Sequence, residues 1–150
     1  LLLLSIGLTI WVQMLRRMVA ARTRELEAER QSVVNVINSI HDPVWLKDTQ
    51  GRYLSCNRRL EEMYGHSQGE MIGKTDFQLL DDKVAAAFRA SDQAAMAAGK
   101  TVAYESVVRN ESTGMQEHVQ TLKTPLLDAQ GHPVAVLGIA RDITALVKAR

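Results

Sequence analysis

The sequence predicts an α+β domain with an antiparallel sheet, preceded by a long N-terminal helix. Short apolar runs bounded by turn residues occur in two groups, and helical segments lie between the groups. Strands that gather at both ends of a domain are typical of the α+β class. An apolar repeat of seven residues before the first run predicts the long helix.

Composition limits the function. The chain has 150 residues, of which 46% are hydrophobic and 23% charged, as in globular proteins. Its 18 basic and 17 acidic residues give a net charge of +1, which argues against a nucleic-acid partner. A single cysteine cannot form an internal disulfide. No cluster of residues resembles a complete enzyme active site, so no catalytic residue is assigned.

Residues 1–15 predict the end of a transmembrane helix. They carry no charge, and Arg16 and Arg17 come directly after them. A helix needs about 20 apolar residues to cross a bilayer, so we expect the helix to start before residue 1. The basic residues place the rest of the chain in the cytoplasm, at the inner membrane. The alternatives are a signal-peptide core or a buried helix, but a signal peptide carries its charge before the apolar run.

Residues 16–41 predict a coiled-coil signalling helix. Apolar residues recur at heptad spacing, at Val12, Val19, Leu26, Val33 and Ile40. β-branched residues at this position favour a parallel dimer, so we expect a homodimer through this helix. Arg22 and Glu29 fall on the second seam position, where they weaken the packing. The alternative is a single helix with a solvated charged face. Pro43 ends the helix.

The first part of the domain, which we expect over residues 42–144, predicts a hairpin and short helices. Residues 43–47 and 52–56 are apolar runs joined by a turn that ends in glycine. Asn57 can cap the next helix, which Gly65 ends. Residues 67–70 form a capping-box pattern for a second short helix. The alanine-rich residues 81–98 predict the longest helix of the domain, stopped by a glycine.

Three more strands are predicted after this helix, over residues 101–108, 116–124 and 133–140. The second ends before Pro125. The third is almost entirely apolar, which indicates a central strand. Residues 145–150 predict the start of a C-terminal signalling helix that leads to an output domain.

The chain resembles a PAS domain, the sensory module of many bacterial signalling proteins. The resemblance covers residues 38–144, and it depends on the order and spacing of several short pieces. These are residues 42–48 with Gly51, Tyr53 and Cys56-Asn57, residues 73–76, 88–99 and 123–125, and the closing run 138–144 with its Asp-Ile-Thr. The resemblance implies a five-stranded antiparallel sheet, helices on one face, a small cavity between them, and an output domain.

The sequence argues against the cofactors that related sensors use. A haem-binding member needs an axial histidine on the long helix, and residues 81–99 contain none. A flavin photoreceptor of this fold carries its reactive cysteine after the first helix, whereas Cys56 precedes it. The four histidines lie at no metal-ligand spacing, so no metal site is expected.

A small-molecule ligand is a further expectation. Large aromatic side chains bury wide areas whatever the function, so a plain hydrophobic core is the alternative. The candidate ligand-binding residues are Trp45, Asn57, Tyr104, Arg109 and His118.

Signal relay is predicted at both ends of the domain. Asp142 and Thr144 lie where the last strand leads into the C-terminal helix. Thr144 can cap that helix by accepting a backbone amide bond, and Asp142 can bind backbone or a basic partner such as Lys47 or Arg141. Arg22 and Glu29 are the relay candidates in the seam, because their weak packing allows two arrangements. The plain alternative for the pair at the exit is a helix cap.

The whole is interpreted as the cytoplasmic PAS relay of a transmembrane receptor, of the sensor histidine kinase type. A diguanylate cyclase or phosphodiesterase receptor is the alternative, and a dimerising adaptor without enzymatic activity is another. Residues beyond Arg150 would discriminate among the three.

Overall fold

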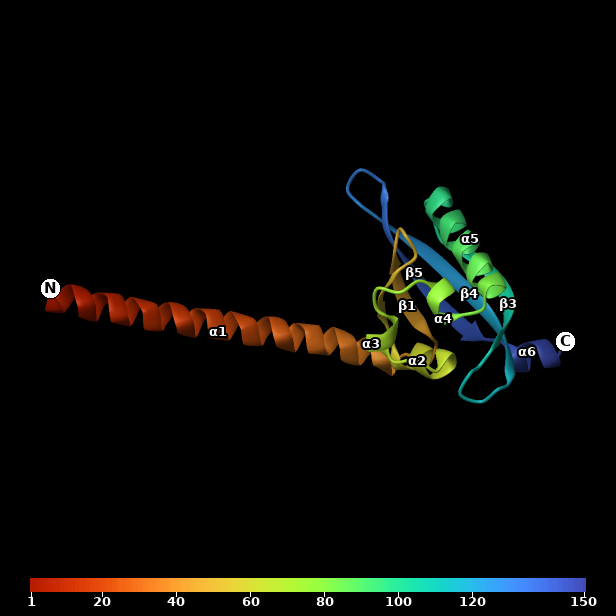
Figure 1. Cartoon of the computed structure of the whole chain (residues 1–150), viewed down its shortest axis with the longest axis horizontal. Helices are drawn as coiled ribbons and strands as arrows, with labels where there is room; N and C mark the ends of the chain where they lie inside the picture. The colour runs from red at the N-terminus through yellow and green to blue at the C-terminus, as the bar shows by residue number, and fades with distance from the viewer. The chain divides into compact units, whose positions relative to one another are not determined.

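The computed structural model describes all 150 residues, which form two units, Leu1–Ile37 and Asn38–Arg150. The predicted N-terminal helix is present as α1 (Leu2–Ser39), a continuous rod in Figure 1. It ends four residues before Pro43. By length and composition it is the one helix of the chain that could cross a membrane.

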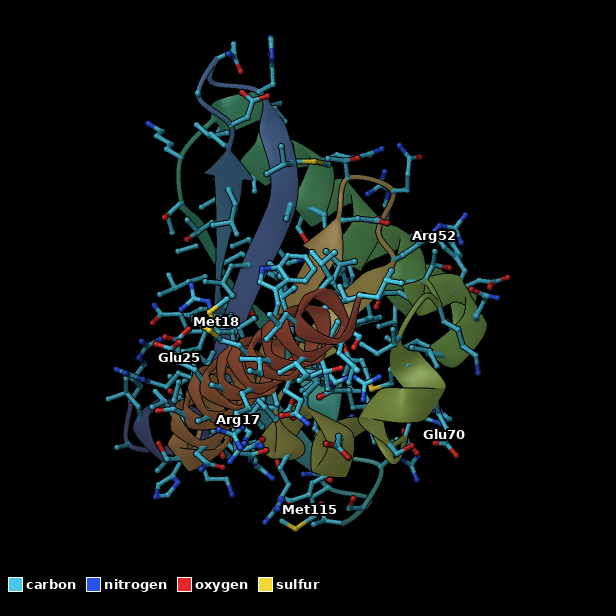
Figure 2. The ribbon with its side chains drawn as sticks, turned by 90° about the vertical axis from the view of Figure 1, so that its left-hand side faces the viewer. Arg17, Met18, Glu25, Arg52, Glu70 and Met115 are labelled. Atoms are coloured by element: carbon cyan, nitrogen blue, oxygen red, sulfur yellow. The ribbon has the colours of Figure 1, made fainter.

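The side chains of α1 project outward all round the helix, as Arg17, Met18 and Glu25 do in Figure 2. The seam residues Val19 and Leu26 are therefore exposed on the single chain. A helix of this kind gains stability only when a membrane or another protein covers its apolar side chains.

The second unit contains a five-stranded antiparallel sheet, so the predicted α+β class is confirmed. Its strands are β1 (Val44–Asp48), β2 (Tyr53–Cys56), β3 (Val102–Arg109), β4 (Gln116–Leu127) and β5 (Pro133–Asp142). Their order across the sheet is β2-β1-β5-β4-β3. The apolar β5 is the central strand, as its composition predicted.

Helices α2 and α5 cover one face of this sheet (Figure 1). The helices of the second unit are α2 (Arg58–Tyr64), α3 (Gln68–Met71), α4 (Asp76–Leu79), α5 (Asp82–Ala98) and α6 (Thr144–Lys148). The Asn57 side chain accepts from the Leu60 amide, and Gly65 ends α2 in the left-handed conformation, both as predicted. The capping box of Ser67 and Glu70 is also present.

One helix, α4, was not predicted, and two strands, β4 and β5, are longer than predicted. The signal for α4 is local, because the Gln78 side chain accepts from the Thr75 amide at 3.0 Å. Strand β4 was expected to end before Pro125 but continues to Leu127. The pairing of β4 with β3 stops at Lys123, which lies opposite Val102. Pro125 lies beyond this pair, where β4 has no neighbour on the β3 side, so the missing N–H of proline costs no hydrogen bond there.

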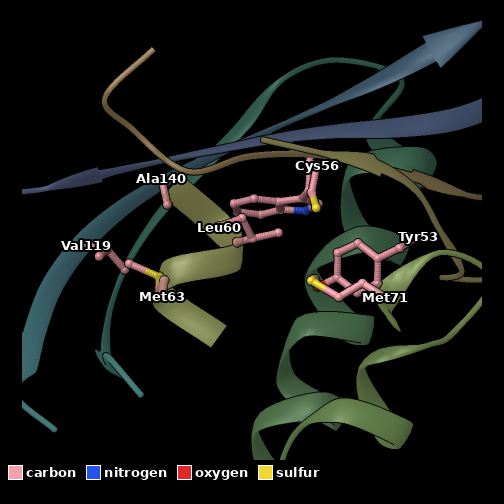
Figure 3. Close-up of a cluster of buried hydrophobic side chains, with 8 residues drawn as sticks. Tyr53, Cys56, Leu60, Met63, Met71, Val119 and Ala140 are labelled. Carbon is pink, nitrogen blue, oxygen red and sulfur yellow. The ribbon is translucent and has the colours of Figure 1, made fainter. Parts of the chain in front are cut away.

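The hydrophobic core lies between the covered face of the sheet and the helices (Figure 3). Met63 of α2 points at Val119 of β4, while Tyr53 of β2 lies beside Met71 of α3. Alternation along the strands sends every second residue toward this core. The same alternation places several polar side chains inside, and these form the candidate site.

Candidate functional site

A small cavity lies between α2, α5 and the covered face of the sheet. Its volume is about 20 Å³, enough for one water molecule. Most of the lining is apolar or aromatic. The lining includes Trp45, Lys47, Tyr104, Ser106, Thr121 and Lys123. Trp45 and Tyr104, two of the predicted ligand-binding residues, thus meet at the same cavity.

Two polar atoms at this cavity have no hydrogen-bond partner. They are Nε1 of Trp45, a residue only 7% exposed, and Oγ of Ser106. Buried polar groups are almost always paired, and an unpaired one costs about 1–3 kcal/mol. A molecule in the cavity that accepts from the indole N–H and bonds to the hydroxyl would remove this cost.

Four charged side chains form a buried ion cluster beside the cavity. Lys47 of β1 and Lys123 of β4 meet Asp76 of α4 and Asp92 of α5, and each residue is only 1–3% exposed. The Lys47 ammonium lies 2.5 Å from the Asp76 carboxylate and 3.2 Å from Asp92. Lys123 also pairs with Asp92. Two positive and two negative charges therefore balance within the cluster, which is how buried charges are tolerated.

The two lysine ammonium groups of the cluster donate different numbers of hydrogen bonds. Lys123 donates to the Phe88 carbonyl at 3.1 Å and to Ser91 Oγ at 2.8 Å besides Asp92, which occupies all three of its N–H groups. Lys47 has two carboxylate partners, and its ammonium lies 4.8 Å from the centre of the Tyr53 ring.

The phenol of Tyr53 closes this arrangement. It donates to the second oxygen of Asp76 at 2.7 Å. Burial, together with the nearby Tyr64 and Asp76, raises the pKa of Tyr53 well above its ordinary value, so the phenol stays a neutral donor. The cluster joins β1, β2, β4, α4 and α5 in one polar network.

Asn57, a predicted ligand residue, lies at the entrance of the domain rather than in the cavity lining. Its side chain accepts from the Val44 amide at 3.0 Å and donates to the Asp42 carbonyl at 2.9 Å. Nearby, the Asn38 side chain accepts from the Arg58 amide. Because Asn57 is fully buried, it fixes the chain where it enters β1 while capping α2.

The exit of the domain is held by three hydrogen bonds. Thr144 Oγ1 accepts from the His118 amide at 2.9 Å, and the Ile143 amide donates to the His118 carbonyl at 2.8 Å. The Asp142 carboxylate accepts from the Thr144 amide at 2.8 Å, and these bonds with Thr144 lower the pKa of Asp142. The expectation that Thr144 caps its own helix was wrong: its hydroxyl holds β4, and Asp142 accepts from the first turn instead.

The entrance and the exit are in contact with each other. The Ala140 amide donates to the Pro43 carbonyl at 3.0 Å. Arg141 lies 3.6 Å from Asp42, and this ion pair is weak because the Arg141 side chain is largely exposed. Of the basic partners expected for Asp142, Lys47 belongs to the buried cluster and Arg141 pairs with Asp42. The start of β1 and the end of β5 are thus joined directly.

The remaining predicted residues lie apart from these places. Arg109 is exposed at the end of β3, 4.0 Å from Glu111. Arg22 pairs with Glu25 on its own helix at 2.6 Å, and Glu29 is exposed on α1. His118 contributes only backbone groups to the hydrogen bonds at the exit. The predicted ligand residues therefore do not form one site.

The buried ion cluster was not predicted from the sequence, although the positions of two charged residues indicate it. Asp92 lies one turn from Phe88 and three residues before Ala95, on the apolar stripe of α5. Lys47 follows Trp45 at the two-residue spacing of a buried strand face. A charged residue in such a position needs a buried partner of opposite sign.

Cys56 is a buried residue of the core. Burial, and next the charge of Glu61, raises the pKa of its thiol to about 11. The thiol is thus protonated at neutral pH, which gives it the character of a small apolar side chain.

Comparison with known proteins identifies relatives in two signalling classes. A methanogenesis regulatory histidine kinase, FilI of Methanothrix harundinacea, is 28% identical over 114 residues, which are 76% of this chain and 13% of the kinase. A diguanylate cyclase of Vibrio cholerae is 26% identical over 116 residues, which are 77% of this chain and 36% of the cyclase. The chain thus spans a minor part of either relative.

Solved structures show the same fold. The PAS domain of BvgS from Bordetella pertussis has a TM-score of 0.65 at 21% identity, covering 81% of this chain and 93% of that one. A PAS domain from Colwellia psychrerythraea has a TM-score of 0.61 at 22% identity, covering 77% and 97%. VqmA of Vibrio cholerae has a TM-score of 0.68 at 21% identity, covering 77% and 52%.

A family match covers most of the chain. The family described as PAS fold matches residues 37–148, which include the sheet, the buried cluster and the exit. The chain therefore belongs to the PAS fold family.

Proposed function

We propose that this chain is the membrane-proximal part of a receptor, in which the PAS domain relays a conformational signal to an output domain after Arg150. The contact between entrance and exit carries the proposal. The Pro43 carbonyl accepts from the Ala140 amide, and β1 pairs with β5 along its whole length, so a displacement at the start of β1 acts directly on β5. From there, Asp142 and Thr144 lead into α6.

Helix α1 supplies the input in this proposal. Its apolar residues before Arg16 would anchor it in the inner membrane, and the cationic residues after them favour the cytoplasmic side. The heptad residues would pair with those of a second α1. Arg22 and Glu29 would leave the middle of that seam weakly packed, which permits two arrangements of similar energy.

The pairing of α1 can be tested by cysteine cross-linking of the full chain in membranes. Leu26→Cys lies on the seam, and its neighbour Glu27→Cys serves as the control outside the seam. We expect rapid disulfide formation by Leu26→Cys and slow formation by Glu27→Cys. Equal rates for the two variants would contradict a coiled coil.

The relay can be tested in the receptor that contains this chain. Replacing Arg22 and Glu29 by leucine should pack the seam tightly and hold the output in one state. A receptor with these changes that still responds to its stimulus would contradict the relay through α1.

The output is proposed to be a histidine kinase, which the FilI relative supports. The diguanylate cyclase relative supports a cyclase as the alternative output by the same type of evidence. The residues after Arg150 discriminate: a histidine-bearing dimerisation helix with an ATP-binding segment indicates a kinase, and a Gly-Gly-Asp-Glu-Phe-like run indicates a cyclase. A stop codon there would indicate an adaptor.

We also propose that the cavity widens by movement of its side chains to hold a small neutral ligand, because its present volume of about 20 Å³ admits only one water molecule. The unpaired Trp45 Nε1 and Ser106 Oγ favour a molecule that accepts one hydrogen bond and shares another. The adjacent ion cluster is already neutral, so a charged ligand would add an uncompensated buried charge. Native mass spectrometry of the purified full chain should show an added mass that is reduced in Trp45→Phe. The same bare mass for both proteins, after extraction from cells, would contradict this.

A further inference from the structure

Strand β3 is a free edge of the sheet. It pairs with β4 only, and the sheet order places it last. The bond from the Asn110 amide to the Met115 carbonyl shows that even-numbered residues of this segment turn their backbone groups toward β4. In an antiparallel pair this orientation alternates, so the N–H and C=O groups of Glu105, Val107 and Arg109 point away from the sheet. An open row of this kind can accept another strand.

A wide groove runs beside the same half of the strand. Its volume is about 880 Å³, and its lining combines the end of β3 with the start of α5 and the ends of α2 and α4. The lining includes Val84, Phe88, Val107, Val108 and Arg109. Helix α5 contacts β4 more extensively than β3, so the helix leaves the edge strand accessible. An added strand would lie about 4.8 Å from β3, in the plane of the sheet.

The exposed side chains of β3 are complementary to those of a second, antiparallel β3 strand. Glu105 and Arg109 are both exposed on the uncovered face, with Val107 midway between them and 51% exposed. An antiparallel pair with a two-fold axis at Val107 places each Glu105 opposite Arg109 of the second copy. It also places the two Val107 side chains side by side. A two-fold axis at Glu105 would instead oppose two like charges.

We propose that β3 pairs with β3 of a second copy of this chain, in the register centred on Val107. The three outward-facing residues then form six backbone hydrogen bonds and two opposite-charge pairs across the interface. The two sheets become one continuous sheet of ten strands. This contact belongs to the PAS domain and does not depend on pairing of α1.

Glu105 and Arg109 can leave their present partners to pair with a second copy. Arg109 lies 4.0 Å from Glu111, and Glu105 lies 3.9 Å from Arg150, and all four side chains are at least half exposed. Ion pairs of this kind contribute little to stability. An extended segment of another protein could bind the same edge, but the opposite charges of Glu105 and Arg109 on either side of Val107 favour a second copy.

The experiment uses disulfide cross-linking of the full chain in detergent micelles. In Val107→Cys the new thiols of two copies would meet on the two-fold axis. Val134→Cys is the matched control, because Val134 has the same exposure of 51% and lies on β5. The native Cys56 is buried and common to both proteins. We expect Val107→Cys to form covalent dimers faster than Val134→Cys, and equal rates would overturn the proposal.

Charge reversal then tests the register. Glu105→Arg or Arg109→Glu, each added to Val107→Cys, turns both opposite-charge pairs into like-charge pairs, and cross-linking should fall about tenfold. The double reversal restores opposite charges and should restore cross-linking. Single reversals without effect, or a double reversal that stays as low as the single ones, would overturn the proposed pairing. Such outcomes would point to random collision or to another protein as the partner of this edge.

Discussion

The indole of Trp45 lies flat over Gly138, its register partner on the neighbouring strand β5. A Cβ atom at position 138 would overlap the indole atoms Cε2, Cζ2 and Nε1. Glycine is therefore required for contact rather than for an unusual backbone angle. The absence of a side chain lets Trp45 cover the strand and form one wall of the cavity.

Gly138→Ala should displace the Trp45 ring and destabilise the domain by about 1–3 kcal/mol, the usual cost of overpacking. Chemical denaturation measures the loss, and the emission of Trp45 in a Trp11→Phe background reports the ring position. Trp45→Leu removes the indole and leaves room for a Cβ atom at position 138. The cost of Gly138→Ala should therefore be much smaller in the Trp45→Leu background, and equal costs in both backgrounds would contradict the overlap.

Asp92 and Lys47 are the two members of the ion cluster that have two partners each, and Asp92 pairs with both Lys47 and Lys123. Asp92→Ala leaves two buried ammonium groups with one carboxylate and should cost about 3–5 kcal/mol of unfolding free energy. Adding Lys123→Met leaves Lys47 paired with Asp76, a balanced set. We expect the double variant to be more stable than Asp92→Ala alone, measured by urea denaturation; a further loss would contradict charge balance as the cause.

The hydroxyl of Thr144 holds the exit by accepting from the His118 amide. Thr144→Val keeps the shape but removes the acceptor, and should cost about 1–3 kcal/mol because the partly buried amide loses its partner. Hydrogen exchange at the His118 amide should accelerate. Thr144→Ser retains the hydroxyl and should exchange like the unmodified protein. Unchanged protection in Thr144→Val would show that the bond does not hold the exit.

The stability of the exit should depend on pH through Asp142. Its pKa is lowered in the folded state by the bonds with Thr144, so its contribution is present above the ordinary pKa of about 3.9. The contribution is lost as the pH falls below that value through the lowered pKa. Asp142→Asn retains an acceptor without the charge, so the difference in unfolding free energy from the unmodified protein should shrink below about pH 4. A difference that stays constant from neutral pH to the acid side of that value would contradict this assignment.

Cys56 should resist alkylation in the folded protein. A rise of its pKa from 9.0 to about 11 lowers the thiolate fraction near neutral pH about 100-fold, and burial restricts access further. Mass spectrometry after iodoacetamide treatment should find the native thiol unmodified and the urea-unfolded thiol modified. Similar alkylation rates in the two states would contradict the burial of Cys56.

Local patterns determined much of the fold. Heptad spacing predicted α1, glycine and asparagine marked the ends of α2, and the apolar composition of residues 133–140 identified the central strand. These signals depend on residues close in the chain, whose backbone preferences and periodicity act without distant partners. The seam, the membrane anchor and the output remain predictions.

Only the tertiary structure determined which partners the buried polar side chains have. Lys47 and Asp92 are 45 residues apart, and only the packing of α5 on the sheet brings them to 3.2 Å. The placement of Thr144 against His118 likewise depends on how β4 lies beside β5, because a hydroxyl can cap its own helix or bond to a neighbouring strand with equal local chemistry. Periodicity shows which side chains point inward, whereas the partner each one meets is set by the register and order of the strands.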